Sequence, residues 1–127
     1  MYGYMLVFFG AGIGGALRHL FNLTSARLFG PDLPVSTLVV NVLGALSIGC
    51  LAGYFATRGH SSQQVQLFLT TGVLGGFTTF SAFSLEAALL WERGQTIGFV
   101  VFVLASVVLS IAGVFAGLAL VRSWHPI

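Results

Sequence analysis

The sequence GGFTTFSAFS, residues 75–84, lies in the middle of an apolar run that is long enough to span a lipid bilayer. Two adjacent glycines followed by two threonines are poor helix formers, and a helix in lipid must satisfy its own backbone hydrogen bonds. The residues that follow supply hydroxyl groups and two phenylalanines, Phe80 and Phe83, three positions apart. The stretch therefore predicts a membrane helix that is broken here, with its freed backbone and aromatic edges available to ions.

The overall composition is that of a membrane protein. Of the 127 residues, 57% are hydrophobic and only 6% are charged, whereas soluble domains carry about 25% charged residues. The chain has no lysine, and a formal net charge of +2 on so few groups is no sign of a basic surface. We expect the lipid bilayer as a partner and no nucleic acid.

Four segments are long and apolar enough to cross a bilayer, and the connections between them are too short to fold alone. The sequence therefore predicts an all-α membrane protein with four transmembrane helices, the third of them broken. Residues 1–127 then form a single four-helix transmembrane domain. The predicted spans are residues 4–28, Val35–Thr57, 64–91 and 97–121.

The few arginines bear on orientation, because positive charge favours the cytoplasmic side of a membrane. Four spans put Arg58 and Arg122 on one side. Arg27 and Arg93 fall on the other side, and Arg18 lies within the first span. The equal count gives no preference for one orientation, which favours insertion in both. Two oppositely inserted copies can pair about an axis in the membrane plane, so we predict a dual-topology, antiparallel homodimer.

No pattern typical of catalysis occurs in the sequence. Glu86 has no carboxylate near it in sequence, and the three histidines are scattered. No spacing resembles a set of metal-binding side chains or a nucleophile with its base. We therefore expect a protein that is not an enzyme.

Polar side chains inside the predicted spans are costly unless they are satisfied or used. Asn41 is the one amide well inside the second span, and it provides either an interhelical hydrogen bond or a donor for a ligand. Ser106 and Ser110 share one face of the fourth helix with Phe102. Serines in membrane helices also bond their own i−4 carbonyl, so both interpretations stay open for them.

The break itself offers two electrostatic environments. A half-helix that begins near Thr79 directs the positive end of its dipole at the break, and the edges of the Phe80 and Phe83 rings are also positive. The half-helix that ends near Gly75 leaves carbonyl groups without partners, which suit a small hard cation. Ordinary aromatic packing is the alternative for the two phenylalanines.

Apart from Arg27 at the end of the first span, Arg18 and Glu86 are the two formal charges inside the spans. Arg18 can extend toward an interface or bond Asn22 one turn further on. For both residues, a structural role and a role as a charge in the vestibule of an ion path stay open.

The sequence GGFTTFSAFSLE, residues 75–86, closely resembles the signature of the Fluc (CrcB) fluoride channels. The sequences NVLG, residues 41–44, and GGALR, residues 14–18, also resemble that family. The resemblance extends over the whole chain in length and in four-helix layout.

This resemblance implies a channel of the bacterial inner (plasma) membrane that exports cytoplasmic fluoride passively and so reduces its toxicity. It implies two pores in each antiparallel homodimer and a central structural Na+, held by the backbone carbonyls of Gly75 and Thr78 from both subunits. Where the polar track of the fourth helix can carry a tyrosine, this chain has Phe102. The residues that the resemblance implies for the fluoride pore are Asn41, Thr79, Phe80, Ser81, Phe83, Ser106 and Ser110.

Two alternatives to a fluoride channel come from other classes of protein. A small dual-topology, proton-coupled multidrug exporter needs a membrane carboxylate near its substrate path, and a first helix with Arg18 in place of an acid argues against it. A scaffold subunit without transport would explain the many glycines, but it leaves a break surrounded by donors and phenyl edges unexplained.

Overall fold

The computed structural model describes residues 2–58 and 62–124, which are helical apart from short connections. Four stretches in it are long and apolar enough to cross a membrane, so the prediction of four spans is confirmed. These spans are Tyr2–Phe29, Val35–Thr57, Gln63–Glu92 and Thr96–Trp124. The helices are α1 (Tyr2–Phe29), α2 (Val35–Arg58), α3 (Gln63–Leu67), the π-helix η1 (Phe68–Leu74), α4 (Gly75–Phe77), α5 (Phe80–Glu92) and α6 (Thr96–Trp124).

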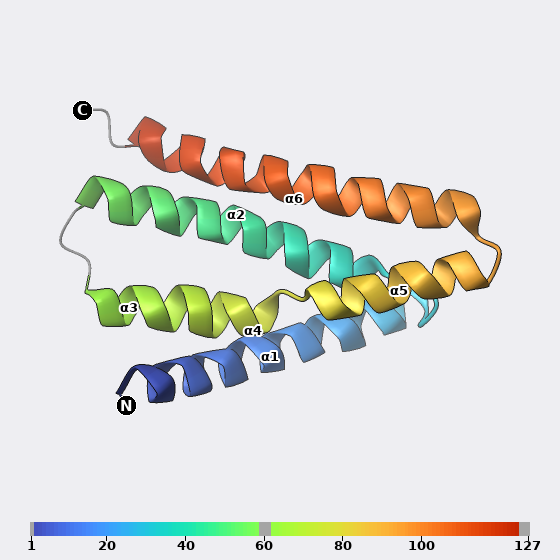
Figure 1. Cartoon of the computed structure of the whole chain (residues 1–127), viewed down its shortest axis with the longest axis horizontal. Coiled ribbons are helices and arrows are strands. Elements are labelled where there is room, and N and C mark those ends of the chain that lie inside the picture. The colour runs from blue at the N-terminus through green and yellow to red at the C-terminus, as the bar shows by residue number, and fades with distance from the viewer. Residues whose placement is uncertain (1, 59–61, 125–127) are drawn as a thin grey trace.

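The four spans run alternately in opposite directions (Figure 1). The start of α1, the end of α2, the start of α3 and the end of α6 lie at one end of the molecule. The turns that join α1 to α2 and α5 to α6 lie at the other end. At both of these turns a glycine adopts the left-handed conformation that ends a helix at low cost, Gly30 (φ 85°) and Gly94 (φ 77°).

The spans pack as two close pairs, α2 against α6 and α1 against η1 and α4. Glycines permit this closeness, because a Cβ on Gly49 of α2 would overlap the Val114 carbonyl oxygen of α6. A Cβ on Gly14 of α1 would likewise overlap the carbonyl oxygen of Val73 in η1. The two pairs contact each other far less. The candidate site lies in the space between the two pairs.

The third span contains two extended residues. Thr78 (φ −87°, ψ 159°) and Thr79 (φ −152°, ψ 122°) separate α4 from α5. The first half-helix, which we expected to end near Gly75, continues two residues further as α4 and ends at Phe77. The reason is packing, because Gly76 lies against α1, where a Cβ would overlap the Ala11 carbonyl. This glycine therefore permits close contact with α1 and does not end its own helix.

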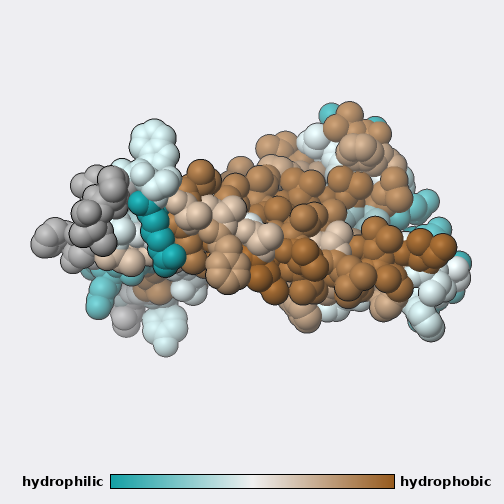
Figure 2. All heavy atoms as spheres, turned by 90° about the horizontal axis from the view of Figure 1, so that it is seen from above, coloured by the Kyte–Doolittle hydropathy of each residue, from teal (hydrophilic) through white to brown (hydrophobic). Residues whose placement is uncertain are grey.

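The surface between the two ends of the molecule is largely apolar. In the part that the structure describes, the buried hydrophobic side chains are few: Val40, Phe77, Ala87, Leu90 and Phe102. Many large apolar side chains are exposed instead, and Figure 2 shows them as a broad hydrophobic region with hydrophilic residues toward both ends. Such a surface is suited to lipid or to a second subunit rather than to water, as in a multi-pass integral membrane protein.

Candidate functional site

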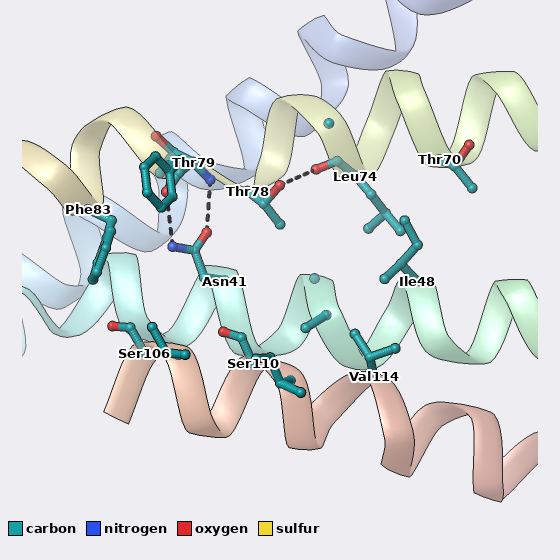
Figure 3. Close-up of a pocket in the computed structure, with 16 residues that line it drawn as sticks. Asn41, Ile48, Thr70, Leu74, Thr78, Thr79, Phe83, Ser106, Ser110 and Val114 are labelled. Carbon is teal, nitrogen blue, oxygen red and sulfur yellow. Dashed lines mark hydrogen bonds between the residues drawn. The ribbon is translucent and has the colours of Figure 1, made fainter. Parts of the chain in front are cut away.

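A groove of about 510 Å³ lies beside the two extended residues. Its walls come from α2, η1, α4, the start of α5 and α6, so it occupies the space between the two helix pairs (Figure 3). Eight of the residues predicted for the fluoride pore or the sodium site line it: Asn41, Gly75, Thr78, Thr79, Phe80, Phe83, Ser106 and Ser110. The other lining residues are mostly small or apolar: Gly44, Ala45, Ile48, Thr70, Leu74, Val107, Ile111 and Val114.

Asn41 of α2 forms two hydrogen bonds with the backbone of Thr79 (Figure 3). Its Nδ2 donates to the Thr79 carbonyl at 3.0 Å, and its Oδ1 accepts from the Thr79 N–H at 2.8 Å. One amide side chain thereby bonds both the N–H and the C=O of an extended residue, as a residue on a neighbouring β-strand would. The interhelical hydrogen bond considered for Asn41 is therefore present. Because Nδ2 carries two hydrogens, a second donor is left at the groove.

Arg18 of α1 is the second side chain that stabilises the interruption. Its Nε donates to the Gly76 carbonyl at 3.3 Å. In an uninterrupted helix that carbonyl would accept from the amide of Phe80, which lies beyond the extended residues. Of the two alternatives considered for Arg18, extension toward an interface and a bond to Asn22, neither describes this contact, and the Asn22 side chain accepts from the Ser36 hydroxyl of α2. Arg18 does not line the groove.

Two backbone carbonyls at the interruption lose the amides that a continuous helix would give them. The amide expected at the Gly75 carbonyl is that of Thr79, which donates to Asn41. The amide expected at the Thr78 carbonyl is that of Ala82, which donates to the Thr79 hydroxyl at 3.1 Å. These are the two carbonyls implied as Na+ ligands, and oxygen atoms of this kind suit a hard cation. Within residues 2–58 and 62–124, no group of three or more His, Cys, Asp or Glu side chains could hold a metal.

The predicted aromatic pair lies on one face of α5. The ring centroids of Phe80 and Phe83 are 5.5 Å apart, as their three-residue spacing predicts. Phe83 also packs on Phe102 of α6 at 5.2 Å, so the packing interpretation holds for one side of its ring. Phe80 also lines the groove, and it is 79% exposed in spite of its contact with the Phe83 ring.

Ser106 of α6 is buried below Phe83 (Figure 3), and its hydroxyl has no hydrogen-bond partner. The i−4 bond considered for this serine is therefore not made. Leaving a buried hydroxyl unpaired costs about 1–3 kcal/mol, which makes it a candidate contact for a ligand. Ser110, one turn further along α6, lines the same groove.

The hydroxyl groups of Thr79 and Ser81 lie 3.3 Å apart. Thr79 accepts the bond that caps the start of α5, as N-cap threonines do. Ser81 itself is exposed and does not line the groove. Its hydroxyl contacts the side chain of Thr79, which does line the groove.

Glu86 lies away from the groove. Its Oε1 accepts from the Thr37 hydroxyl of α2 at 2.9 Å, and its Oε2 is buried without a partner. It lines a separate cavity of about 70 Å³ with Arg93 and the residues that join α1 to α2. Thr37 was not among the residues predicted from the sequence, although it precedes Asn41 by four residues and so shares its helix face.

Comparison with known proteins gives a consistent family assignment. The family model described as "CrcB-like protein, Camphor Resistance (CrcB)" matches residues 5–118. A "Fluoride-specific ion channel FluC" of Rhodopseudomonas palustris (strain BisB5) is 57% identical over 120 residues, 94% of this chain and 97% of the relative. A protein of the same name from Methylobacterium nodulans is 55% identical, covering 94% of this chain and 96% of the relative. "Fluoride-specific ion channel FluC 2" of Nitrobacter hamburgensis is 52% identical with the same coverage.

The two bonds of Asn41 generate a prediction about stability. The variant Asn41→Leu leaves the N–H and C=O of Thr79 unpaired, and each buried backbone group without a partner costs about 1–3 kcal/mol. We expect a clearly lower thermal unfolding midpoint in detergent. The matched control is Ser47→Ala, which removes an exposed polar group from the same helix. Equal midpoints for the two variants would contradict the role given to Asn41.

Proposed function

Because this chain belongs to the CrcB family, we propose that it is a fluoride-selective ion channel of a bacterial membrane, as the names of its relatives state for them. Members of this family are ion channels and not enzymes. Passive export down the electrochemical gradient would lower cytoplasmic fluoride and so reduce its toxicity. Fluoride enters cells from acidic surroundings as neutral hydrogen fluoride, ionises in the more alkaline cytoplasm, and then needs a path for the anion.

The observation that carries this proposal is the buried, unpaired hydroxyl of Ser106 at a groove that also holds an amide donor and two phenyl rings. Fluoride is a small, strong hydrogen-bond acceptor, so a path for it must replace its water with donors. The second N–H of Asn41 and the hydroxyls of Ser106 and Ser110 can donate. The edges of Phe80 and Phe83 add positive charge density without a formal charge.

Selectivity against chloride follows from size and donor fit in this arrangement. Donors fixed by the protein suit an anion of one radius, and a larger anion meets them at a poorer distance while it loses its own water. The donor Asn41 is held by Thr79, and Phe83 is held by Phe102. The path would therefore be rigid enough for this discrimination.

A proton-coupled drug exporter fits the groove less well. Such a mechanism needs a carboxylate at the substrate path. The residues that line the groove include no Asp or Glu, and Glu86 lies at the separate cavity beside Arg93. The groove therefore favours passive movement of an anion.

We further propose that two copies form an antiparallel, dual-topology homodimer with two pores. One copy leaves the groove open along one side and exposes many large apolar side chains, which a second copy would cover. The even distribution of arginines between the two membrane sides supports insertion in both orientations. In such a dimer the two interruptions can meet near the middle of the membrane.

The carbonyls of Gly75 and Thr78 are proposed to hold a structural Na+ at this junction. Both have lost their helical amide partners, and both residues line the groove. Two carbonyls from each copy would give four oxygen ligands. The ion would supply fixed positive charge between the copies, while Asn41 and Arg18 keep the backbone extended.

The proposed function is tested by anion efflux from liposomes that contain the purified protein. Fluoride efflux, measured with a fluoride-selective electrode, should be fast. Chloride efflux should match that of protein-free liposomes. Equal rates for fluoride and chloride would contradict selectivity. Uptake of a cationic drug against a proton gradient without fluoride efflux would favour the exporter.

The exposed ring of Phe80 generates a second prediction. The variant Phe80→Ile removes the positive ring edge from the groove, and we expect fluoride efflux to fall about tenfold, the factor given by a contact worth about 1.4 kcal/mol. The elution position of the purified protein in size-exclusion chromatography should stay unchanged. The control is Phe8→Ile, which changes an exposed ring on α1 that does not line the groove. Unchanged efflux in Phe80→Ile would leave packing as the role of this residue.

Ser106 permits a test that separates function from stability. Because its buried hydroxyl is unpaired, Ser106→Ala should not lower the thermal unfolding midpoint. Fluoride efflux should nevertheless fall, since the variant removes a donor from the proposed path. A lower unfolding midpoint with normal fluoride efflux would contradict this expectation and would identify Ser106 as a structural residue.

A further inference from the structure

Gly44 of α2 lies directly against Thr78, one of the two extended residues. A Cβ on Gly44 would overlap the Thr78 methyl carbon Cγ2. It would also lie 3.6 Å from the Thr78 Cβ and 3.7 Å from Cδ2 of Phe77, both ordinary contact distances. The one atom in conflict is therefore the methyl group of a single side chain.

The direction of that methyl group is fixed by hydrogen bonding. The Thr78 hydroxyl donates to the Leu74 carbonyl at 2.9 Å, and the Thr78 N–H donates to the same oxygen at 3.0 Å. Because threonine is branched at Cβ, fixing the hydroxyl also fixes the methyl group. Gly44 thus leaves the space that lets Thr78 keep both bonds to Leu74.

We propose that Gly44 is a positioning residue for the ion site: by leaving room for the Thr78 methyl group, it keeps Thr78 bonded to Leu74 and holds the Thr78 carbonyl and the start of α5 in place. This inference rests on the proposed channel function, since it assigns a role in conduction. Gly44 follows Asn41 by three residues on the same helix face. One face of α2 therefore supports both extended residues, Asn41 through hydrogen bonds to Thr79 and Gly44 through space for Thr78.

Gly49 on the same helix shows what an ordinary packing glycine looks like. A Cβ there would overlap the backbone carbonyl of Val114, which no side-chain change can remove. At Gly44 the conflict disappears if Thr78 loses its methyl group. The variant Thr78→Ser does this and keeps the hydroxyl that bonds Leu74. Thr78→Ser is therefore expected to rescue Gly44→Ala but not Gly49→Ala.

The experiment compares Gly44→Ala and Gly49→Ala, each alone and combined with Thr78→Ser, together with the wild type and Thr78→Ser. Fluoride efflux from liposomes and the thermal unfolding midpoint in detergent are measured for all six proteins. Gly44→Ala should lower efflux about tenfold with Thr78 present, because overpacking forces the side chain off its rotamer. In the Thr78→Ser background the same change should lower efflux less than about threefold. Gly49→Ala should lower the midpoint equally in both backgrounds.

The outcomes separate this inference from the proposed function. A Gly44→Ala defect of the same size in both backgrounds, or a Gly49→Ala defect that Thr78→Ser also relieves, would overturn the role of Gly44. If the wild type or Thr78→Ser conducts no fluoride, the midpoints decide alone. Recovery of the Gly44→Ala midpoint by Thr78→Ser then supports the contact, and no recovery overturns it. Absence of fluoride efflux in the wild type overturns the proposed function, whatever the midpoints show.

Discussion

The pairing of one amide side chain with one extended backbone residue is the interaction on which the rest of the site depends. In lipid no water can satisfy the N–H and C=O groups of residues that leave a helix. Asn41 supplies both partners for Thr79, and Arg18 supplies one for the Gly76 carbonyl. The extended residues are stable at this depth because two other helices, α1 and α2, provide the hydrogen bonds that the third span has given up.

The same bonds create the chemistry proposed for the site. Drawing the Thr79 amide toward Asn41 frees the Gly75 carbonyl, and drawing the Ala82 amide toward the Thr79 hydroxyl frees the Thr78 carbonyl. The two carbonyls that have lost their helical amides therefore belong to α4 and to the first extended residue. On the other side of the interruption α5 begins, with the positive end of its dipole directed back at the extended residues. One local change in backbone path provides both environments.

The groove exists because glycines allow close contact within two helix pairs but not between the pairs. Close approach at Gly49 and Gly14 binds α2 to α6 and α1 to η1, respectively. Backbone contact within each pair leaves the two pairs apart along most of their length, and the contact that remains between them is mainly that of α1 with α2 and of α5 with α6. The groove opens between the pairs, beside the interruption. An apolar groove with a few polar groups is thus a consequence of tight packing elsewhere, and it brings Ser106 opposite residues that are far away in sequence.

The four spans could be predicted from the sequence, because hydrophobic length is a property of consecutive residues. The contact between Phe80 and Phe83 could be predicted as well, because helical periodicity is local. The sequence also indicated a break within residues 75–84, which contain the two extended threonines. The continuation of the helix to Phe77 depends on tertiary packing, and so do the hydrogen bonds from Arg18 to Gly76 and from Thr37 to Glu86. These contacts join residues 49 and 58 positions apart, so they depend on which helices become neighbours. Packing across the whole molecule determines which helices become neighbours, and no local sequence pattern indicates the result.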